Sequence, residues 1–396
     1  MGYTPAIYAT KDIQLGKDYI FFAGCQNGIF KYHFTTGEIS EYCTDPICKH
    51  YGSSSTCRIA NFWKGSFFRA FSDGIVYTAP LDTDQNSQLT KHLFCFNSDT
   101  MTNTLLDSSV SSSNMYCVSE KYIYFTNVVT KDGKSYYNHK QVELSSGKVK
   151  VFGEETEGVT PYNLIGAIGG CLYATDSERT VTYICSEDKP GEFTKFWDKP
   201  IVNLWAGAND LFFKSRAPED NTPKEEAKYF FYHTDKDGKI IAKHELVGGM
   251  RWCSIYDGRY LYYIPDEDVY VTNLDGGSIK IHSRELYRLD METGKREIAF
   301  TFDGDYATMA LKFSFGNDMI VYGNKIYTAH IGEATSMRDP KTGELIYGGK
   351  SINCTDGIAI IDMSNGDITY VTANYSRRGG EMTSNVEHIP MDIKGE

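Results

Sequence analysis

A short pattern of apolar and aromatic residues recurs along this chain, usually just after a turn signal such as Asp-Gly or Asn-Asp. An aliphatic residue is followed by any residue and then by an aromatic one, with Ala174 ending a weaker copy. The copies are Ile20–Phe22, Ile75–Tyr77, Ile123–Phe125, Leu172–Ala174, Leu211–Phe213, Leu261–Tyr263 and Ile320–Tyr322. Polar and apolar residues alternate around them, which is the period of a β-strand. The copies lie roughly 40 to 60 residues apart, a spacing typical of propeller blades.

The fullest example of the repeating unit lies between residues 257 and 300. Two more strand-like segments follow the pattern there, Glu285–Leu289 and Lys295–Phe300, and a turn ending at Gly294 joins them. Glycine suits such a turn because it accepts positive φ without a steric cost. A short apolar segment, Trp252–Ile255, comes before the pattern. Each unit is therefore expected to supply four strands.

These units predict an all-β fold, a seven-bladed β-propeller of four-stranded antiparallel blades that occupies residues 1–376. A four-stranded sheet with two apolar faces is unstable alone, whereas sheets packed radially bury those faces on one another. Helix content should be small, since no long window shows a 3.6-residue period. The predicted blades are approximately residues 10–44, 62–107, 112–154, 162–198, 201–247, 250–303 and 307–372.

The closure of such a ring requires the two ends of the chain to meet. Residues 377–396 form a C-terminal tail after the last blade. A closing strand is expected from the segment Ala6–Ala9 or from Val386–Ile389 in the tail, and the sequence favours neither.

Four of the units carry long insertions, and inserted loops on a rigid scaffold are where binding residues tend to lie. They are Leu81–Lys91, Ser215–Lys228, Pro265–Ser283 and Lys325–Asn353. The last contains the turn signal Asp339–Gly343, which predicts an extra hairpin. Ser215–Lys228 holds two prolines and many charges, so we expect it to be the most protease-sensitive segment.

The charge balance excludes two classes of partner. With 40 basic and 52 acidic residues the formal charge is −12. Nucleic acids and anionic membranes are recognised by clustered Lys and Arg, so neither is expected as a partner. No apolar run is long enough for a transmembrane segment. The N-terminus lacks the pattern of a secretory signal, which leaves a cytoplasmic protein or one whose signal has been removed. A monomer is expected.

The sharpest local chemistry lies in the segment from Cys43 to Cys57. Three thiols and an imidazole, from Cys43, Cys48, His50 and Cys57, form a tetrahedral set suited to a structural zinc ion. Their spacing differs from the usual Cys-x2-Cys, so a disulfide between Cys48 and Cys57, or between Cys43 and Cys25, is the competing interpretation. Either would make the segment a staple between the first two blades, and no other cofactor is expected.

Other candidate residues are better explained by structure than by chemistry. Asp235–Gly238 resembles the start of a calcium loop, but Leu246 stands where that loop needs a glutamate, so a hairpin turn is favoured. Four histidines fall at corresponding hairpins and are expected to be strand residues: His33, His92, His139 and His233. Five cysteines in strand-like runs are expected to be small buried hydrophobes: Cys95, Cys117, Cys171, Cys185 and Cys253.

The chain lacks the sequence motifs of nucleophile-elbow hydrolases, zinc proteases, P-loop enzymes and dinucleotide-binding dehydrogenases. Paired carboxylates for glycoside hydrolysis stay open, because the two acids need not be close in sequence. No catalytic residue can therefore be named from the sequence.

The cysteine segment, beside the repeated Asp-Gly-x-Tyr-Ile-Tyr-type strands, resembles a family of propeller proteins. These are the DUF5050-like, low-density-lipoprotein-receptor-like propeller proteins of clostridial gut bacteria, many of them surface lipoproteins. The resemblance implies a propeller outside the cytoplasm, at the cell surface, and no defined activity. We expect a binding or scaffold module for a glycan or protein ligand. The alternative is a glycan hydrolase or lyase with carboxylates at the propeller mouth.

Overall fold

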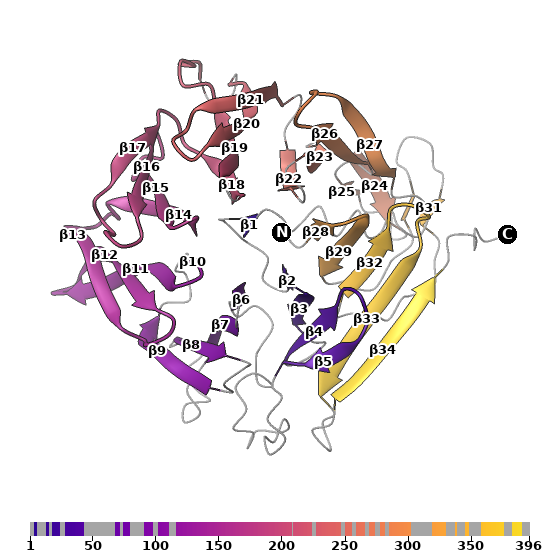
Figure 1. The fold of residues 1–396 in the computed structure, drawn as a ribbon, viewed down its shortest axis with the longest axis horizontal. Coiled ribbons are helices and arrows are strands. Elements are labelled where there is room, and N and C mark those ends of the chain that lie inside the picture. The colour runs from indigo at the N-terminus through magenta and orange to yellow at the C-terminus, as the bar shows by residue number, and fades with distance from the viewer. Residues whose placement is uncertain are drawn as a thin grey trace. The chain divides into compact units, whose positions relative to one another are not determined.

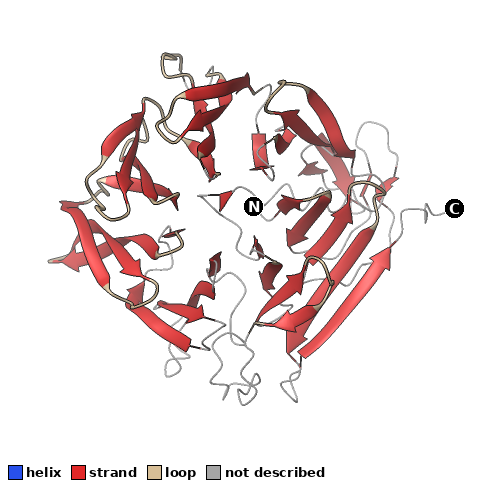
Figure 2. Ribbon diagram, viewed as in Figure 1, coloured by secondary structure: helices blue, strands red, loops and turns tan. Residues whose placement is uncertain are grey.

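The computed structural model is built from β-strands, which pair antiparallel wherever their partners are described (Figures 1 and 2). In the described part of the chain, no helix is long and apolar enough to cross a membrane. The structure describes residues 4–5, 13–15, 18–23, 28–42, 68–71, 74–79, 91–97, 102–110, 116–207, 209–223, 227–246, 250–255, 259–265, 269–273, 278–281, 285–301, 319–329, 337–338, 345–347, 358–375 and 382–389.

The chain divides into two units. The first comprises residue 1, residues 9–70 and residues 247–396, and the second comprises residues 2–8 and 71–246. Each unit is a set of small antiparallel sheets, described separately below.

Four sheets belong to the first unit, and two of them have the strand order of a simple up-and-down meander. The first sheet contains β2 (Ile13–Leu15), β3 (Tyr19–Ala23), β4 (Ile29–His33) and β5 (Ile39–Glu41). The second contains β22 (Met250–Ile255), β23 (Tyr260–Pro265), β26 (Glu285–Asp290) and β27 (Arg296–Thr301). The third contains β28 (Met319–Tyr322), β29 (Lys325–Ala329), β32 (Ile358–Asp362), β33 (Ile368–Tyr375) and β34 (Met382–Ile389). The fourth, in the order given, contains β25 (Ser278–Ile281), β24 (Val269–Asn273), β30 (Met337–Arg338) and β31 (Leu345–Tyr347).

The second unit has four sheets, three of them in meander order and one with β1 added beside β18, and residues 68–70 of β6 are counted with the first unit. They begin with β6 (Phe68–Phe71), β7 (Gly74–Ala79), β8 (Lys91–Asn97) and β9 (Thr102–Val110). The next contains β10 (Tyr116–Val118), β11 (Tyr122–Lys131), β12 (Lys134–Glu143) and β13 (Val149–Glu157). The third contains β14 (Tyr162–Ile168), β15 (Cys171–Asp176), β16 (Thr182–Ser186) and β17 (Thr194–Trp197). The last contains β1 (Thr4–Pro5), β18 (Val202–Ala206), β19 (Asp210–Arg216), β20 (Tyr229–Asp235) and β21 (Ile240–Glu245).

The recurring apolar pattern marks the second strand of most sheets. On β3, β11, β15, β19 and β23 its three consecutive residues are all buried, as Ile123, Tyr124 and Phe125 are at 0% exposure. Successive strand residues point to opposite faces, so burial of all three means that both faces of the strand are covered. One such core joins the sheets of β11 and β15 through Tyr124, Leu164 and Cys185.

A six-residue turn with glycine in fifth place joins the last two strands of four sheets. These turns are His33–Glu38, Glu143–Lys148, Asp290–Lys295 and Asp362–Asp367. In each, the first residue's carbonyl accepts a bond from the glycine amide, and the glycine has a φ between 69° and 80°. The first side chain also caps the turn: Asp290 Oδ1 accepts bonds from the amides of Glu292 and Thr293. The predicted Asp-Gly and Asn-Gly turns therefore stand, and Asp235–Gly238 is one of them.

The seventh copy of the pattern was assigned to the wrong strand. In these four sheets the amide of the second turn residue donates to a backbone carbonyl just before another strand of the sheet. The accepting residues are Asp18, Lys121, Arg259 and Asn324, which directly precede β3, β11, β23 and β29. By this register β29 is the second strand of the last sheet, and Ile320–Tyr322 lie on its first strand, β28. Two turn signals flank β28, and the pattern was matched to the earlier one. The last insertion accordingly begins after β29.

Two insertions form one extra sheet. β30 and β31 pair on either side of the Asp339–Gly343 turn signal, so the predicted hairpin is confirmed. β24 and β25, from the Pro265–Ser283 insertion, also pair, and β24 pairs with β30. That last pairing has no local signal in the sequence, because it joins segments more than 60 residues apart.

Both chain ends add a fifth strand to a sheet. β34, which includes Val386–Ile389, pairs with β33 over eight positions and so extends the last sheet (Figure 1). β1 pairs with β18. Ala6–Ala9 lie outside the described residues. In the first unit, Phe34 in the turn after β4 also stacks on Tyr322 of β28, with ring centroids 4.3 Å apart.

Candidate functional site

The predicted zinc or disulfide residues lie outside the described part of the chain. This applies to Cys43, Cys48, His50, Cys57 and Cys25. Among the described residues, no group of three or more His, Cys, Asp and Glu side chains is placed to hold a metal ion. The chemistry of the described residues must therefore be sought elsewhere.

The histidine prediction is confirmed, and burial is confirmed for three of the five strand cysteines, while the burial of Cys253 lies outside what the structure describes. The four histidines lie on strands, on β4, β8, β12 and β20. His139 is fully buried, and burial lowers its pKa to about 4, so it is neutral near pH 7. Cys95, Cys117 and Cys185 are buried and carry free thiols, while Cys171 is a half-buried free thiol.

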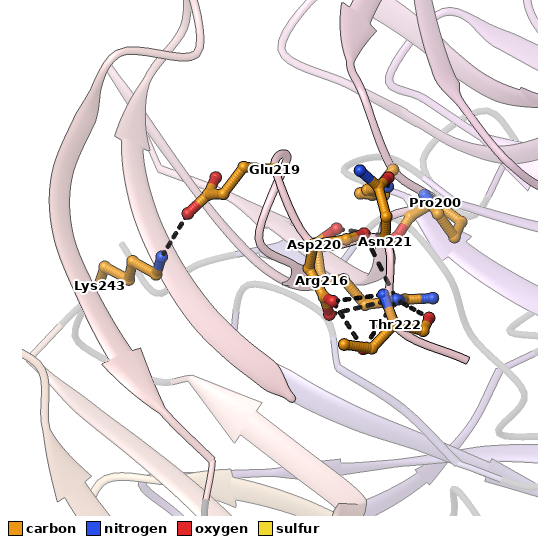
Figure 3. Close-up of polar contacts among 9 residues, drawn as sticks. Pro200, Arg216, Glu219, Asp220, Asn221, Thr222 and Lys243 are labelled. Carbon is orange, nitrogen blue, oxygen red and sulfur yellow. Dashed lines mark hydrogen bonds and ion pairs between the residues drawn. The ribbon is translucent and has the colours of Figure 1, made fainter. Parts of the chain in front are cut away.

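The best-ordered polar cluster of the second unit lies in the Ser215–Lys228 insertion, between β19 and β20. Arg216, the last residue of β19, pairs with Asp220: its Nε lies 3.1 Å from Asp220 Oδ2. Its Nη2 donates to the carbonyl oxygens of Asp220 and Thr222 (Figure 3). The two charged side chains are only 15% and 14% exposed. One guanidinium thus holds three points of the loop.

Asp220 completes this cluster from the other side. Its Oδ1 accepts bonds from the amide and the hydroxyl of Thr222, at 2.9 and 2.6 Å. The bond from Arg216, followed by the two from Thr222, holds the pKa of this carboxyl well below its usual range. Asp220 is therefore ionised at any physiological pH and acts as a fixed acceptor.

The base of the loop is anchored to the neighbouring sheet. Ser215 is fully buried and donates its hydroxyl to the carbonyl of Pro200, at 3.0 Å. Thr182 on β16 donates to the carbonyl of Lys199 and accepts the amide of Ile201, both at 2.9 Å. The segment between β17 and β18 is thus tied on both sides, and the loop rests on it.

Four polar side chains project around this loop, and we call them the loop rim: Lys199, Glu219, Asn221 and Lys243. Lys199 Nζ donates to Asn221 Oδ1 at 3.2 Å. Glu219 is 77% exposed and lies 3.9 Å from Lys243 Nζ, pointing away from the Arg216 cluster (Figure 3). Lys243 Nζ also lies 4.0 Å from the ring centre of Phe230, a cation–π contact. The rim offers two ammonium groups, an amide and a carboxylate, which suit a ligand rich in hydroxyl or amide groups.

Buried donors lie behind the rim. Tyr232 and Trp197 pack edge to face, with ring centroids 4.9 Å apart, and are 0% and 7% exposed. Among the described residues, neither the Tyr232 hydroxyl nor the Trp197 Nε1 finds a hydrogen-bond partner. Burial, and secondarily the charge of Glu219, raises the pKa of Tyr232. The wall behind the rim is therefore neutral and aromatic.

A second polar cluster lies between two sheets of the same unit. Tyr124 on β11 donates to Glu187 Oε1 at 3.1 Å, and Gln141 on β12 donates to both the Tyr124 hydroxyl and the Glu187 carbonyl, at 2.9 and 2.8 Å. All three are less than 10% exposed. Burial raises the pKa of Glu187, against the bonds from Ser119 and Tyr124 and the charge of Lys121. This cluster connects the sheets of β11 and β16 through buried hydrogen bonds.

The sequence carried a signal for the loop cluster and none for the second cluster. Arg216, Asp220 and Thr222 are close in sequence inside the Ser215–Lys228 insertion. The sequence predicts protease sensitivity for this segment and does not predict a polar cluster. Glu187 is 46 residues from Gln141 and 63 from Tyr124. Only the packing of two sheets brings those three together.

Comparisons with known proteins give similarity of fold at low sequence identity. No protein-family profile matches this sequence, and no curated protein matches it. An oligogalacturonate lyase from Vibrio parahaemolyticus is 8% identical, with 99% of this chain and 92% of that chain covered and a TM-score of 0.45. The β-propeller domain of the Trilobed protease from Pyrococcus furiosus is 11% identical, with coverages of 90% and 94% and a TM-score of 0.46. An uncharacterized protein from Listeria monocytogenes is 9% identical, with coverages of 89% and 97% and a TM-score of 0.43.

Proposed function

We propose that this chain is a closed seven-bladed propeller that binds a glycan or a protein ligand at the loop rim. Seven of the sheets follow the seven predicted blade ranges in order, although the described strands of the last sheet begin only at Met319. Closure is supported by the stacking of Phe34 from the first sheet on Tyr322 from the last. In this arrangement the ring closes by packing of faces, while β34 extends its own sheet.

The observation that carries the binding proposal is the fixed conformation of the loop beside its rim. Arg216 and Asp220 bond to each other and to Thr222, so their charges are used to hold the loop. A loop that is ordered before binding loses less conformational entropy when a ligand arrives. Lys199, Asn221, Glu219 and Lys243 are then presented on a preorganised surface, as binding sites generally require.

The proposal is tested by screening the purified chain on glycan and peptide arrays. We expect at least one class of polar ligand to bind, and the variants Lys243→Ala and Asn221→Ala to weaken that binding. The matched control is Lys239→Ala, an exposed lysine at the opposite end of the same sheet, in the β20–β21 turn. Full retention of binding by both rim variants, or equal loss in the control, would remove the rim from the site.

The enzyme alternative is measured on the same samples. Glycans that bind are incubated with the chain, and new reducing ends or unsaturated products are followed over time. A hydrolase or lyase would release such products, and replacement of its carboxylates would stop the release without abolishing binding. Tight binding with no product favours the binding module.

Three further proposals follow from the sequence resemblance and the cysteine segment. The protein belongs with the DUF5050-like propellers, acts at the cell surface as a monomer, and is stapled by Cys43, Cys48, His50 and Cys57. The alternative address is the cytoplasm. Thiol titration and elemental analysis distinguish the staples: one equivalent of zinc indicates the metal, and two protected thiols without zinc indicate the Cys48–Cys57 disulfide. Freely reactive thiols without metal would exclude both.

A further inference from the structure

Buried polar atoms without a partner are concentrated in one layer of the second unit, where the sheet of β14–β17 packs on the sheet of β18–β21. Among the described residues five buried side-chain atoms find no hydrogen-bond partner, and four of them face this layer. Trp197 and Tyr232 belong to the hydrophobic cluster that fills it. Thr175 and Thr234 lie two residues after Tyr173 and Tyr232 on the same strands, so they face the same way. Each such group costs free energy in the folded chain, so their concentration points to an added partner.

Two of these groups, Trp197 Nε1 and the Tyr232 hydroxyl, lie at the end of the layer next to the loop rim. Their rings meet edge to face, with centroids 4.9 Å apart. Trp197 is the last residue of β17, two residues before Lys199 of the rim. Tyr232 lies opposite Lys243 in the register of β20 and β21, and Lys243 Nζ is 5.6 Å from its ring centre. The two donors therefore lie directly behind the rim.

The side chains between the rim and these rings are long and loosely held. Lys243 Nζ lies 4.0 Å from the ring centre of the half-buried Phe230, and 3.9 Å from Glu219 (Figure 3). Glu219 is 77% exposed, and an ion pair of this kind contributes little to stability. Phe230 and Tyr232 lie on the same face of β20, with ring centroids 6.1 Å apart. Rotation of the Lys243 side chain would therefore uncover the Phe230 ring and the adjoining side of Tyr232.

The chemistry around the two donors selects a neutral ligand with several oxygens. An indole N–H and a phenol carry no charge, so they suit a hydroxyl, ether or carbonyl oxygen. The charge that acts on Tyr232 is the carboxylate of Glu219, which repels an anion. A sugar ring presents C–H groups on one face and hydroxyl oxygens around its edge, which matches the Phe230 ring with donors beside it. Successive carbonyls of an extended peptide point to opposite sides, so they do not reach two adjacent donors.

We propose that this end of the layer binds a neutral sugar residue of an oligosaccharide. One face of the sugar ring packs on Phe230, and its oxygens accept hydrogen bonds from Tyr232 and Trp197. Lys243 stays part of the site, because it exchanges the long contact with Glu219 for a hydroxyl of the same sugar. The two donors become paired in the complex, so the cost of burying them unpaired is removed by binding and contributes to affinity. This inference rests on the proposed function and narrows its ligand to a neutral glycan.

The test titrates the full chain by calorimetry with neutral hexose oligosaccharides and with polyuronate oligosaccharides of equal length. We expect a neutral oligosaccharide to bind, and the polyuronates to bind more weakly because Glu219 repels them. Tyr232→Phe should weaken binding of the neutral oligosaccharide roughly tenfold, because a hydrogen bond from a buried donor is lost. The same variant should melt no lower than the wild type, since it removes an unpaired hydroxyl. The matched control is Tyr173→Phe, a tyrosine of the same layer that is 2% exposed, which should leave binding unchanged.

A second measurement follows the other donor directly. The chain has four tryptophans, so an NMR spectrum of the full chain contains four indole N–H signals. The signal of Trp197 is identified by its loss in Trp197→Phe. Addition of the neutral oligosaccharide to the wild type should move this signal to lower field, as a new hydrogen bond does.

The outcomes separate this inference from the proposed function. Preferential binding of polyuronates or peptides, an equal loss in Tyr173→Phe, or an unmoved Trp197 signal at saturation would overturn the inference. Full binding by Tyr232→Phe together with a lower melting temperature would also overturn it, because a buried water would then pair the hydroxyl. If Tyr232→Phe binds fully while Asn221→Ala and Lys243→Ala do not, the loop rim stands and the sugar subsite falls. If both rim variants also bind fully, the proposed function itself falls.

Discussion

Two carboxylates of the second unit, Asp220 and Glu187, show opposite ways of holding an acid in place. Asp220 has a guanidinium beside it and two donors from Thr222, and the pKa of its carboxyl is lowered. Glu187 is 7% exposed and is held by a phenol and a hydroxyl, and burial raises its pKa. Partners that carry charge keep an acid ionised, whereas neutral partners do not compensate for lost solvation.

The two acids also differ in location, because Asp220 lies in a loop and Glu187 lies between two packed sheets. The Arg216–Asp220 cluster needs no other sheet to satisfy its charges, so the loop keeps its form through its own contacts. The Tyr124–Gln141–Glu187 cluster exists only while two sheets are packed. Variants in the first should change the loop, and variants in the second should change the stability of the unit.

The largest effect is expected from Gln141→Leu. Gln141 donates to both Tyr124 and the Glu187 carbonyl, and leucine leaves these buried acceptors without a donor. The free energy of unfolding should fall by about 1 to 3 kcal/mol, measured by urea denaturation. The control is Tyr136→Phe, which removes the phenol that donates to Glu157 at an exposed end of the same sheet. An equal loss of stability in the control would mean that the buried Tyr124–Gln141–Glu187 cluster contributes no more than an exposed hydrogen bond.

The next largest effect concerns the dependence of stability on pH, which has opposite signs for Glu187 and Asp220. Glu187 has a raised pKa, so this group binds more protons in the folded chain than in the unfolded chain. Its contribution to the free energy of unfolding therefore falls as pH rises above about 4.3. Glu187→Gln removes this term, so the variant should gain on the wild type as pH rises. The groups facing Glu187, namely Ser119, Tyr124, Lys121 and Asp188, stay the same in both proteins.

For Asp220 the sign is reversed. Its lowered pKa gives a contribution that is fully present above about pH 3.9 and is lost as pH falls. Asp220→Asn should therefore be less stable than the wild type near neutral pH and approach it in acid. Denaturant midpoints measured across the acid range check both variants. Parallel profiles for the two substitutions would contradict the contrast.

A smaller, local effect is expected from Arg216→Ala. The substitution removes four hydrogen bonds that hold residues 220 and 222, so the loop should open while the sheets stay intact. A glutamate-specific protease should then cut after Glu219 faster than in the wild type, with an unchanged circular dichroism spectrum. Cleavage after Glu219 in the wild type at the same rate would show that Arg216 does not order the loop.

The smallest effect is expected from Glu219→Gln. Glu219 is 77% exposed and 3.9 Å from Lys243, and an exposed pair of this kind contributes less than about 0.5 kcal/mol. Unfolding should be unchanged within error in a urea titration. A clear loss of stability would indicate that the loop rim supports the fold as well as any ligand.

The sequence was informative wherever a structural signal is local. Three consecutive apolar residues after a turn identify a strand with both faces covered, and this located β3, β11, β15, β19 and β23. Glycine at the fifth place of a hairpin turn located the last two strands. The same locality caused the error at Ile320–Tyr322, since two turns flank β28 and the pattern alone does not say which strand is second.

Features that depend on distant contacts could not be predicted. The Tyr124–Gln141–Glu187 cluster joins two sheets, and the β24–β30 pairing joins two insertions. The length of β11 and β12, ten residues each, could not be predicted either. The turn at Asp132 and Gly133 that joins them lies far from the apolar pattern. For the Ser215–Lys228 insertion, protease sensitivity stays a prediction, and the pairing of Arg216 with Asp220 could not be foreseen because paired and unpaired charges have the same composition.

The pairing of β1 with β18 has a consequence for how the chain is made. Thr4 pairs with Ala206 and Pro5 with Trp205, so β1 leaves the ribosome about 200 residues before its partner strand. At roughly 5 to 20 residues per second, synthesis of the intervening chain takes on the order of 10 to 40 seconds. Throughout that time β1 cannot pair with β18, so this pairing forms only after about half of the chain has been made.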